Sequence, residues 1–578
     1  MLRPQAGIQV DKFYPPTDWL DSNNQQIDIR KNAENNSIVL LAGHSADFTK
    51  YSLLGLLAQV SSGTYDVYID DVLVGSGITS NTQYDIDFST IATSYGTATT
   101  PEELVLHKIV IKPTTSGATI TKFHCARTTG VSTSQNQGVL WCHLELSNSI
   151  NLENILGSGS LGAQLYVNRI CFAVTSSKNK IEVPNLEVFR FASSLKIFNP
   201  LTNLSVTTSS LYFRFSDLSS IKRIIFDNFN ISGNCEYGFY QDNLLEQINT
   251  NTKIKGYSCD YCFRYNRSLK MLPNFDYSNV TSLVDFLREA TSLFPTKINL
   301  ASATSLKRAI IIGSGTYPMR GLRGLKVSNE APFSGSSPQI DVSYTGLDRD
   351  ALVELFQSLP TVTGSQTLKC AYATGNNLTK VGSPTIDENG VASGFSSSNY
   401  FSISGISTAD KQKTRKSFEL KVKVTLPSTL TNSQIVYYPN HGQSGLKLNS
   451  NGTITFLIYS SGTTVYQIDS TTVFSTNEMI YVKAVINNNL AKLFTSYDGN
   501  SWNLENSLDL TDMPSDVTTD NYSRIGVSGE STPSTYFAGT IFLEETYVKV
   551  EQNYLMKGYI TDTDKAIATD KGWGLVLS

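Results

Sequence analysis

The sequence predicts a mainly β, multidomain protein: an N-terminal β-sandwich, a repeat solenoid with short helices, and a second, inserted β-domain. Three observations support this prediction. The chain has 578 residues, too many for one hydrophobic core and equivalent to about three or four average domains. Apolar residues alternate with polar ones near both ends of the chain, as they do in half-buried strands. Between these regions, apolar positions recur every 24 residues.

The N-terminal β-sandwich is expected over residues 35–139. Tyr65, Val67 and Ile69 fall on one face of a strand, because successive side chains of a strand point to opposite faces. The segment His107–Lys112 has the same period of two. Clusters of turn residues separate these runs, as they do between the strands of a small sandwich.

Residues 1–34 are expected to form an N-terminal arm. Pro15 and Pro16 oppose a helix in this arm. Trp19 is its aromatic residue, and two roles are open for it. It either anchors the chain to another protein or straps the arm to the adjoining sandwich.

The solenoid is expected over residues 140–345, where two columns of apolar residues keep the 24-residue spacing. The first column holds Ile221, Leu245, Leu269 and Leu293. The second, six residues earlier in each unit, holds Phe215, Phe239, Phe263 and Leu287. One unit cannot bury its apolar face alone, so neighbouring units must stack. Strands are expected at the first column, and helices of one or two turns in the preceding segments, such as Ser282–Ala290.

The repeat resembles a known family. The block Ser268–Asp276, followed by Asn279–Leu283, is similar to the leucine-rich repeats of the bacterial surface-antigen type. Such repeats recur in phage fibre and decoration proteins, although the asparagine-rich consensus of other leucine-rich repeats is absent here. The start of the chain also resembles these fibres, in which Pro-x-Asp-Trp-Leu precedes a sandwich; here this motif is Pro16–Leu20.

In phage proteins of this type a helix caps the array, and a second helix ending in Lys-Gly-Trp follows it closely. Apolar spacing predicts the first helix over residues 347–359. The second is expected over 562–571, just before Trp573 at the far end of the chain. We therefore expect a split cap, formed by residues 346–379 and 553–578, around an inserted domain.

The inserted domain is expected over residues 380–552, where strand alternation is continuous. Its size, its strand number and the hairpin turn at Asp498–Gly499 resemble the laminin-G/concanavalin-like jelly roll. The resemblance implies a sugar site, which needs an aromatic platform with polar neighbours. The candidate glycan contacts are Tyr437, Tyr438, His441, Tyr459, Tyr466 and Trp502. The alternative for these side chains is packing in the core or at its rim.

Composition excludes several classes of partner. The formal net charge is −4 and there is no basic stripe, so we expect no nucleic-acid partner. No run approaches the ~20 apolar residues of a membrane span, so we expect no membrane insertion. The segment Met1–Gly7 lacks the apolar run of a signal peptide.

Motifs for catalysis or metal binding are also missing from the sequence. It contains no nucleophile elbow, P-loop or zinc-protease motif. The adjacent carboxylates of Asp70–Asp71 and Glu544–Glu545 point apart in strands, so neither pair forms a glycosidase site by itself. Cys259 and Cys262 form a CxxC pair without two further ligands at zinc spacing, which favours buried packing over a metal site. We expect no catalytic residue, cofactor or metal.

The resemblance implies a non-enzymatic bacteriophage virion structural protein at the surface of the particle, either a tail fibre or a receptor-binding adhesion protein. Its expected partners are other virion proteins and a host-surface glycan or receptor, and we expect a homo-oligomer. The alternatives are a head fibre or capsid-decoration protein, a polysaccharide depolymerase, and a bacterial surface adhesin.

Overall fold

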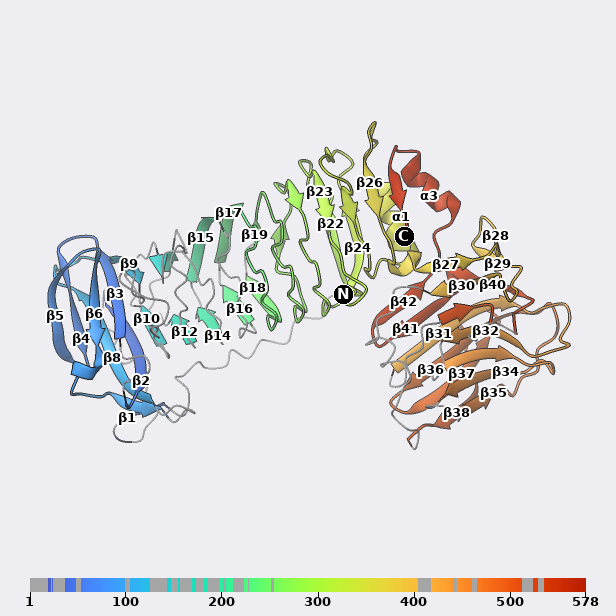
Figure 1. Ribbon diagram of the computed structural model, residues 1–578, viewed down its shortest axis with the longest axis horizontal. Coiled ribbons are helices and arrows are strands. Elements are labelled where there is room, and N and C mark those ends of the chain that lie inside the picture. The colour runs from blue at the N-terminus through green and yellow to red at the C-terminus, as the bar shows by residue number, and fades with distance from the viewer. Residues whose placement is uncertain are drawn as a thin grey trace. The chain divides into compact units, whose positions relative to one another are not determined.

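Strands dominate the computed structural model of the protein (Figure 1). The structure describes residues 19–21, 23, 37–47, 53–98, 104–124, 143–146, 154–155, 169–172, 181–183, 197–200, 204–210, 223–226, 228–250, 254–403, 417–439, 444–459, 465–511, 523–528 and 535–578. Within them, α-helix is confined to α1 (Arg349–Ser358) and α3 (Asp562–Thr569). Single 3-10 turns form η2 (Phe88–Thr90), η3 (Thr374–Asn376) and η4 (Leu543–Glu545). The mainly β class is confirmed, and the chain divides into two compact units, residues 1–280 and 281–578.

Two sheets form a sandwich at the start of the first unit. The seven-stranded sheet has the order β1-β7-β8-β2-β10, with the β4–β5 hairpin on β8, and the four-stranded sheet has the order β11-β9-β3-β6. Their strands are β1 (Trp19–Asp21), β2 (Ile38–Ser45), β3 (Leu53–Val60), β4 (Thr64–Ile69), β5 (Val72–Thr79), β6 (Thr82–Asp87), β7 (Gly96–Ala98), β8 (Leu104–Pro113), β9 (Ile120–His124), β10 (His143–Leu146) and β11 (Asn154–Ile155). As predicted, Tyr65, Val67 and Ile69 share one fully buried face. The Tyr65 hydroxyl donates to the carbonyl of Thr82 in the other sheet at 2.7 Å, which ties the two layers together.

The backbone around Trp19 is an edge strand of this sandwich. Trp19 pairs with Ala98 of β7 in an antiparallel register. This pairing holds the backbone of Trp19 on the sandwich, and the role of its side chain as an anchor stays a prediction. The side chain of Trp19 and residues 1–18 lie outside the described residues.

Parallel ladders follow in the first unit, with the orders β12-β14-β16-β18 and β13-β15-β17 and the pair β19-β20. Their strands are β12 (Arg169–Phe172), β13 (Ile181–Val183), β14 (Ile197–Pro200), β15 (Leu204–Ser210), β16 (Arg223–Phe226), β17 (Asn228–Asn234), β18 (Gln247–Thr250), β19 (Ile254–Lys255) and β20 (Phe275–Asp276). From β12 to β18 successive strands enter alternate ladders, so each coil of the chain gives one strand to each of the two longer ladders. Arg223 lies opposite Gln247, which is the 24-residue spacing of the sequence.

The apolar columns are buried where the structure describes them. The rings of Phe239 and Phe263 stack with centroids 5.3 Å apart and planes 1° from parallel. Leu245 and Leu269 are fully buried at equivalent places. Leu287 and Leu293 are buried as well, whereas Phe215 and Ile221 lie outside the described residues.

The short helices expected in each repeat are not found in residues 228–250 and 254–348, where turns take their place. Within the segment expected to be helical, Asp285 and Glu289 have φ angles of 52° and 64°, and a left-handed residue cannot continue a right-handed helix. The same two left-handed positions recur at 24-residue intervals, as Tyr237, Tyr261 and Asp285 and as Gln241, Tyr265 and Glu289. The strands also begin after their column leucines rather than at them.

The second unit begins with parallel ladders of its own, with the orders β21-β23-β25-β26-β43 and β22-β24. Their strands are β21 (Ser282–Leu283), β22 (Thr296–Leu300), β23 (Arg308–Ile310), β24 (Leu322–Val327), β25 (Ile340–Asp341), β26 (Thr367–Lys369) and β43 (Gly574–Val576). The last strand, β43, comes from the C-terminus and pairs in parallel with β26.

The two helices lie side by side at the end of this ladder (Figure 1). Their bounds agree with the segments expected from the sequence. Arg349 of α1 donates two hydrogen bonds to Asp564 of α3, at 2.9 and 3.0 Å. Trp573 is only 2% exposed, and its indole N–H donates to the carbonyl of Pro360 at 2.9 Å.

A two-sheet β-sandwich occupies the chain between β26 and α3. The seven-stranded sheet has the order β27-β30-β39-β32-β33-β34-β35, and the nine-stranded sheet has the order β28-β29-β40-β31-β36-β37-β38, with β41 on β31 and β42 on β41. Their strands are β27 (Leu378–Val381), β28 (Thr385–Ile386), β29 (Val391–Ser393), β30 (Tyr400–Ile403), β31 (Ser417–Thr425), β32 (Gln434–Pro439), β33 (Ser444–Leu448), β34 (Ile454–Tyr459), β35 (Val465–Asp469), β36 (Met479–Asn487), β37 (Leu490–Ser496), β38 (Asn503–Asp509), β39 (Ser523–Ile525), β40 (Thr540–Phe542), β41 (Tyr547–Val550) and β42 (Asn553–Lys557). One core lies between the sheets, where Phe418 of the nine-stranded sheet stacks on Phe456 of the other with centroids 6.2 Å apart.

The chain enters and leaves this sandwich at one place. The hydroxyl of Thr374, just before β27, donates to the carbonyl of Tyr554 in β42 at 3.2 Å. The side-chain amide of Asn377 donates to the carbonyl of Leu555. Arg323 of β24 donates to the carbonyl of Gln552 at 2.7 Å, so the neighbouring coil also holds this junction.

The buried columns give a direct stability prediction. Leu245→Ala or Leu269→Ala should lower the free energy of unfolding by roughly 2–5 kcal/mol, because each removes a fully buried side chain from a stacked unit. Leu244→Ala is the matched control, since the adjacent Leu244 is 45% exposed and its loss should change stability by less than about 0.5 kcal/mol. Denaturant unfolding measures both, and equal effects at 244 and 245 would contradict the stacked register.

The junction of the two helices gives a second prediction. Asp564→Ala should destabilise the second unit by roughly 1.5–3 kcal/mol, because it removes charge-assisted bonds from a side chain that is 7% exposed. Asp562→Ala on the same helix is the control, because Asp562 is 98% exposed and its pair with Lys565 is worth less than about 0.5 kcal/mol. A double-mutant cycle with Arg349→Ala measures the coupling; additive effects of the two changes would show that the pair does not join the helices.

Candidate functional site

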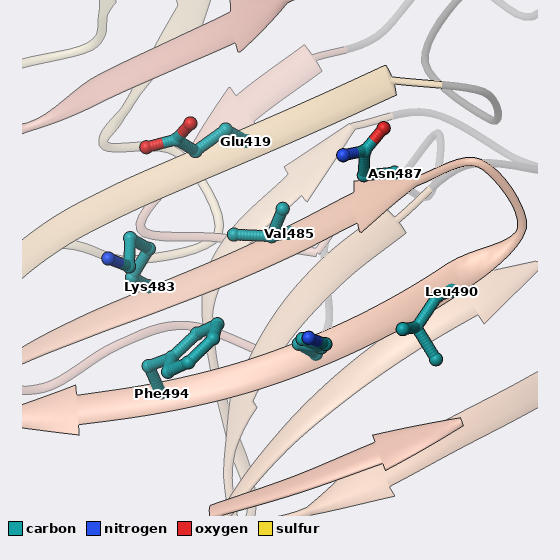
Figure 2. A pocket seen from close by; sticks show the side chains of 7 residues that line it. Glu419, Lys483, Val485, Asn487, Leu490 and Phe494 are labelled. Atoms are coloured by element: carbon teal, nitrogen blue, oxygen red, sulfur yellow. The ribbon is translucent and has the colours of Figure 1, made fainter. Parts of the chain in front are cut away.

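A hollow of about 300 Å³ opens on the nine-stranded sheet of the second sandwich (Figure 2). It lies over three neighbouring strands, β31, β36 and β37. The residues that line it are Glu419, Lys483, Val485, Asn487, Leu490, Lys492 and Phe494. The hollow therefore combines charged, amide, aliphatic and aromatic side chains within one small space.

Strand alternation explains why these side chains face outward. Along β31 every second residue is buried in the core, which leaves Glu419, Lys421 and Lys423 on the outer face. Adjacent strands keep this face in register: Lys483 lies opposite Phe494, and Val485 lies opposite Lys492. The pattern that predicts the strands from the sequence also selects the lining of the hollow.

Lys483 lies against two aromatic rings. Its ammonium nitrogen is 4.1 Å from the centroid of Trp502 and 5.0 Å from that of Phe494. A cation over an aromatic face is attracted by the ring quadrupole, and the attraction strengthens as the pair loses water. One face of Trp502 therefore holds this lysine at the border of the hollow.

A tight turn between β37 and β38 positions Trp502. The Asp498 carboxylate accepts hydrogen bonds from the backbone N–H groups of Asn500 and Ser501, at 2.8 and 2.7 Å, and from the hydroxyl of Ser501 at 2.9 Å. These bonds hold the pKa of Asp498 well below its usual value. As expected, Asp498 and Gly499 act as turn formers.

Gly499 fits this turn for two reasons. Its φ is +75°, which L side chains rarely adopt, and a Cβ there would come within 3.0 Å of the Tyr481 ring. The turn therefore packs directly on the outer face of the sheet, next to the site.

A second group of charges includes Lys423, on the same outer face of β31 as Glu419. Lys423 lies 3.3 Å from Glu545, and its ammonium is 5.1 Å from the Tyr481 ring centroid. Burial lowers the pKa of Lys423, but its bonds to Tyr481 and the charge of Glu545 outweigh this effect and raise the pKa above its usual value. The positive charge of Lys423 is therefore balanced by the carboxylate of Glu545.

Lys483 has a different electrostatic environment. Burial lowers its pKa, Glu419 opposes this change, and the neighbouring Lys421 adds to it. The carboxylate of Glu419 also accepts a hydrogen bond from the Tyr547 hydroxyl, and burial together with this bond raises the Tyr547 pKa. In the hollow, Glu419 thus already accepts a hydrogen bond, and the charge of Lys483 is less well compensated than that of Lys423.

The six candidate glycan contacts predicted from the sequence differ in their burial and in whether the structure describes them. Tyr437 is 2% exposed and belongs to the core, where burial raises its pKa and leaves no surface for a sugar. Tyr438 is also buried, and Tyr466 packs partly buried against the core. These three positions agree with the packing alternative. His441 and the side chain of Tyr459 lie outside the described residues.

Of these six, the structure brings only Trp502 beside the hollow, within the residues that it describes. The lysines and Phe494 are not among the residues predicted from the sequence, because the predicted platform comprised only tyrosine, tryptophan and histidine. The signal was present in the outward positions of the alternating strands, where lysines and an aromatic ring follow one another on neighbouring strands.

A buried histidine pair in the first sandwich is the other titratable cluster of note. Nδ1 of His107 lies 2.8 Å from the Asp70 carboxylate, and its Nε2 lies 3.0 Å from Nε2 of His44. Both rings also stack on Phe88. Because the two histidines are buried in the core, the cluster offers no access to a substrate.

The cysteines of the CxxC pair are buried free thiols. A Cβ at Gly256 would lie 2.6 Å from the sulfur of Cys235 and 2.8 Å from that of Cys259, so the thiols pack against this glycine. Burial raises the pKa of Cys259 and of Cys262 well above the usual value. No group of three or more metal-binding side chains occurs in the part of the chain that the structure describes.

None of the described helices has the length and apolar character that crossing a membrane requires. No family model matches the chain, and no curated protein matches it.

Solved structures show weak likenesses. The binding domain of botulinum neurotoxin DC in complex with SialylT is similar over 34% of this chain and 46% of that chain, at 10% identity and a TM-score of 0.23. The CBM40 domain of a Ruminococcus gnavus IT-sialidase, bound to α2,3-sialyllactose, is similar over 28% of this chain and 85% of that chain, at 18% identity and a TM-score of 0.21. Domains LG4-5 of the mouse laminin α1 chain are similar over 24% and 36%, at 14% identity and a TM-score of 0.19. The chain thus spans less than half of the first of these structures, and likenesses at these TM-scores carry no argument about its function.

Proposed function

We propose that the protein is a non-enzymatic adhesion protein on the surface of a bacteriophage particle, and that its second sandwich binds a host-surface glycan in the hollow over β31, β36 and β37. A tail fibre or receptor-binding protein is the form that we favour. The observation that carries the proposal is the lining of the hollow.

The lining offers each kind of contact that a sugar ring uses. The ring of Phe494 and the aliphatic side chains of Val485 and Leu490 provide an apolar surface for C–H groups. The amide of Asn487 donates and accepts hydrogen bonds, and the lysine ammonium groups donate them to sugar oxygens. Small-molecule sites typically combine an apolar lining with a few polar groups in this way.

The phage assignment rests on the resemblance of the repeat block and of the N-terminal motif to phage fibre proteins. The parallel ladders with a 24-residue register support a leucine-rich-repeat solenoid. The meeting of the chain ends at Asn377 and Leu555 supports the split cap and the inserted jelly roll. We propose that the N-terminal part, including Trp19, attaches the protein to other virion proteins, and that several copies assemble on each particle.

The lining of the hollow also favours binding over cleavage. Glycoside hydrolysis generally uses two carboxylates that flank the bond to be broken. Among the residues that line the hollow, Glu419 carries the carboxylate, and this carboxylate accepts a hydrogen bond from the Tyr547 hydroxyl. This arrangement supports an adhesion protein over a depolymerase.

The full-length protein should bind oligosaccharides on a glycan array, and Phe494→Ala should weaken this binding about tenfold, because it removes the aromatic wall of the hollow. Tyr536→Ala is the control: Tyr536 is an exposed aromatic residue of the same sandwich outside the hollow, so its loss should leave affinity unchanged. Circular dichroism checks that both variants are folded. Absence of binding to any glycan, or an equal loss in both variants, would contradict the proposed site.

Immunogold electron microscopy tests the place of the protein. Antibodies against the chain should label the tails of phage particles produced by cells that express it. Label over the capsid would instead favour a head fibre or decoration protein with the same modules. Label confined to the bacterial surface would contradict the virion assignment and favour an adhesin.

A further inference from the structure

We infer that the hollow selects an acidic saccharide, whose carboxylate or sulfate group binds between Lys483 and Lys492 while its ring lies against Phe494. This inference rests on the proposed glycan-binding function and adds the chemical class of the ligand. Three independent observations support it: the charge of the lining, the pairing of like charges across the strands, and the apolar wall.

The lining carries an excess of positive charge. It contains Lys483 and Lys492 against one carboxylate, that of Glu419, which gives a formal charge of +1. Within the part of the chain that the structure describes, neither lysine has a carboxylate within 4.0 Å, in contrast to Lys423 with its partner Glu545. An anion placed between the two ammonium groups would give both of them charge-assisted hydrogen bonds.

The strand register adds a like-charge pair. Lys421 and Lys483 lie directly opposite each other on β31 and β36. Like charges in this arrangement destabilise a sheet, since their side chains are close neighbours. Glu545, 4.0 Å from Lys421, offsets part of this repulsion, and a bound anion would relieve more of it at Lys483.

The apolar wall distinguishes a saccharide from a free inorganic anion. Phosphate or sulfate alone would contact the lysines and gain nothing from Phe494, Val485 and Leu490. A sugar ring bearing the acidic group would bury these surfaces and bring its hydroxyl groups to Asn487. The geometry therefore fits an acidic residue within a glycan.

The protonation of Lys483 gives the site a predictable pH dependence. Burial lowers the pKa of this lysine, and an anionic ligand stabilises its charged form. Affinity should therefore fall as the pH rises through the lysine pKa. The fall should begin at a lower pH than for an ordinary lysine.

The decisive experiment measures binding of the full-length protein, by calorimetry, to four probes: oligosaccharides that end in glucuronic acid, in 6-sulfogalactose, in glucose and in galactose. We expect binding to at least one acidic probe to exceed that to its neutral counterpart about tenfold or more. Lys483→Gln and Lys492→Gln should each remove this preference. Lys447→Gln on the other sheet should retain it, because Lys447 lies on β33, away from the hollow.

The outcomes separate this inference from the proposed function. Preference for the glucuronic probe alone assigns a carboxylated glycan, and preference for the sulfated probe alone assigns a sulfated one. Equal binding of acidic and neutral probes, or a preference that survives both hollow variants, would overturn the inference while leaving glycan binding intact. An equal loss of the preference for acidic probes in Lys447→Gln would show that positive charge attracts these probes non-specifically, and this result would also overturn the inference. Failure to bind any glycan on the array would remove the proposed function itself.

Discussion

The carboxylate of Asp564 makes the interaction on which the architecture of the second unit depends. It accepts two hydrogen bonds from Arg349 and a third, at 2.9 Å, from the backbone N–H of Thr561. One side chain therefore both caps α3 and fixes it to α1, and its burial is tolerated because its charge is paired. The two partners are 215 residues apart, with the whole second sandwich between them. The contact between Arg349 and Asp564 holds α1 beside α3 and so brings the two ends of the sandwich together. The strands of the sandwich therefore do not depend on the register of the parallel ladders.

The same junction ends the parallel ladder of the second unit. A ladder that ended at β26 would expose the N–H and C=O groups of an open edge, which invites pairing with other chains. The C-terminal strand β43 pairs with β26 and, with only three residues, ends the ladder in a short edge. The backbone N–H of Cys370 donates to the carbonyl of Val576 at 3.0 Å. Trp573 and the two helices cover the adjoining apolar surface, as terminal units of repeat arrays must. The second sandwich lies in the chain between β26 and β43 and does not interrupt their pairing.

Much of the fold was predictable because its signals are local. Alternation identified strands such as β4 and β31, and helical spacing identified α1 to within a few residues. The resemblance to phage caps indicated α3. The short helices of the repeat were predicted wrongly, because apolar spacing does not reveal the left-handed backbone at Asp285 and Glu289.

The site was predictable only in part. Tyr437 and Trp502 are both aromatic residues in a β-domain, and only cross-strand pairing shows that one enters the core while the other borders Lys483.

The construction of the hollow also bears on how strongly it can bind. Its lining comes from three paired strands rather than from loops, so its side chains are held in place before a ligand arrives. A volume of about 300 Å³ is at the small end of ligand pockets and accommodates little more than one sugar ring. A contact of this size between one copy and one glycan is weak, since only a few groups meet. Several copies that face the same cell surface would convert weak contacts into firm attachment through their high effective concentration. Under the proposed function, the small hollow and the assembly of several copies on one particle would act together in adhesion.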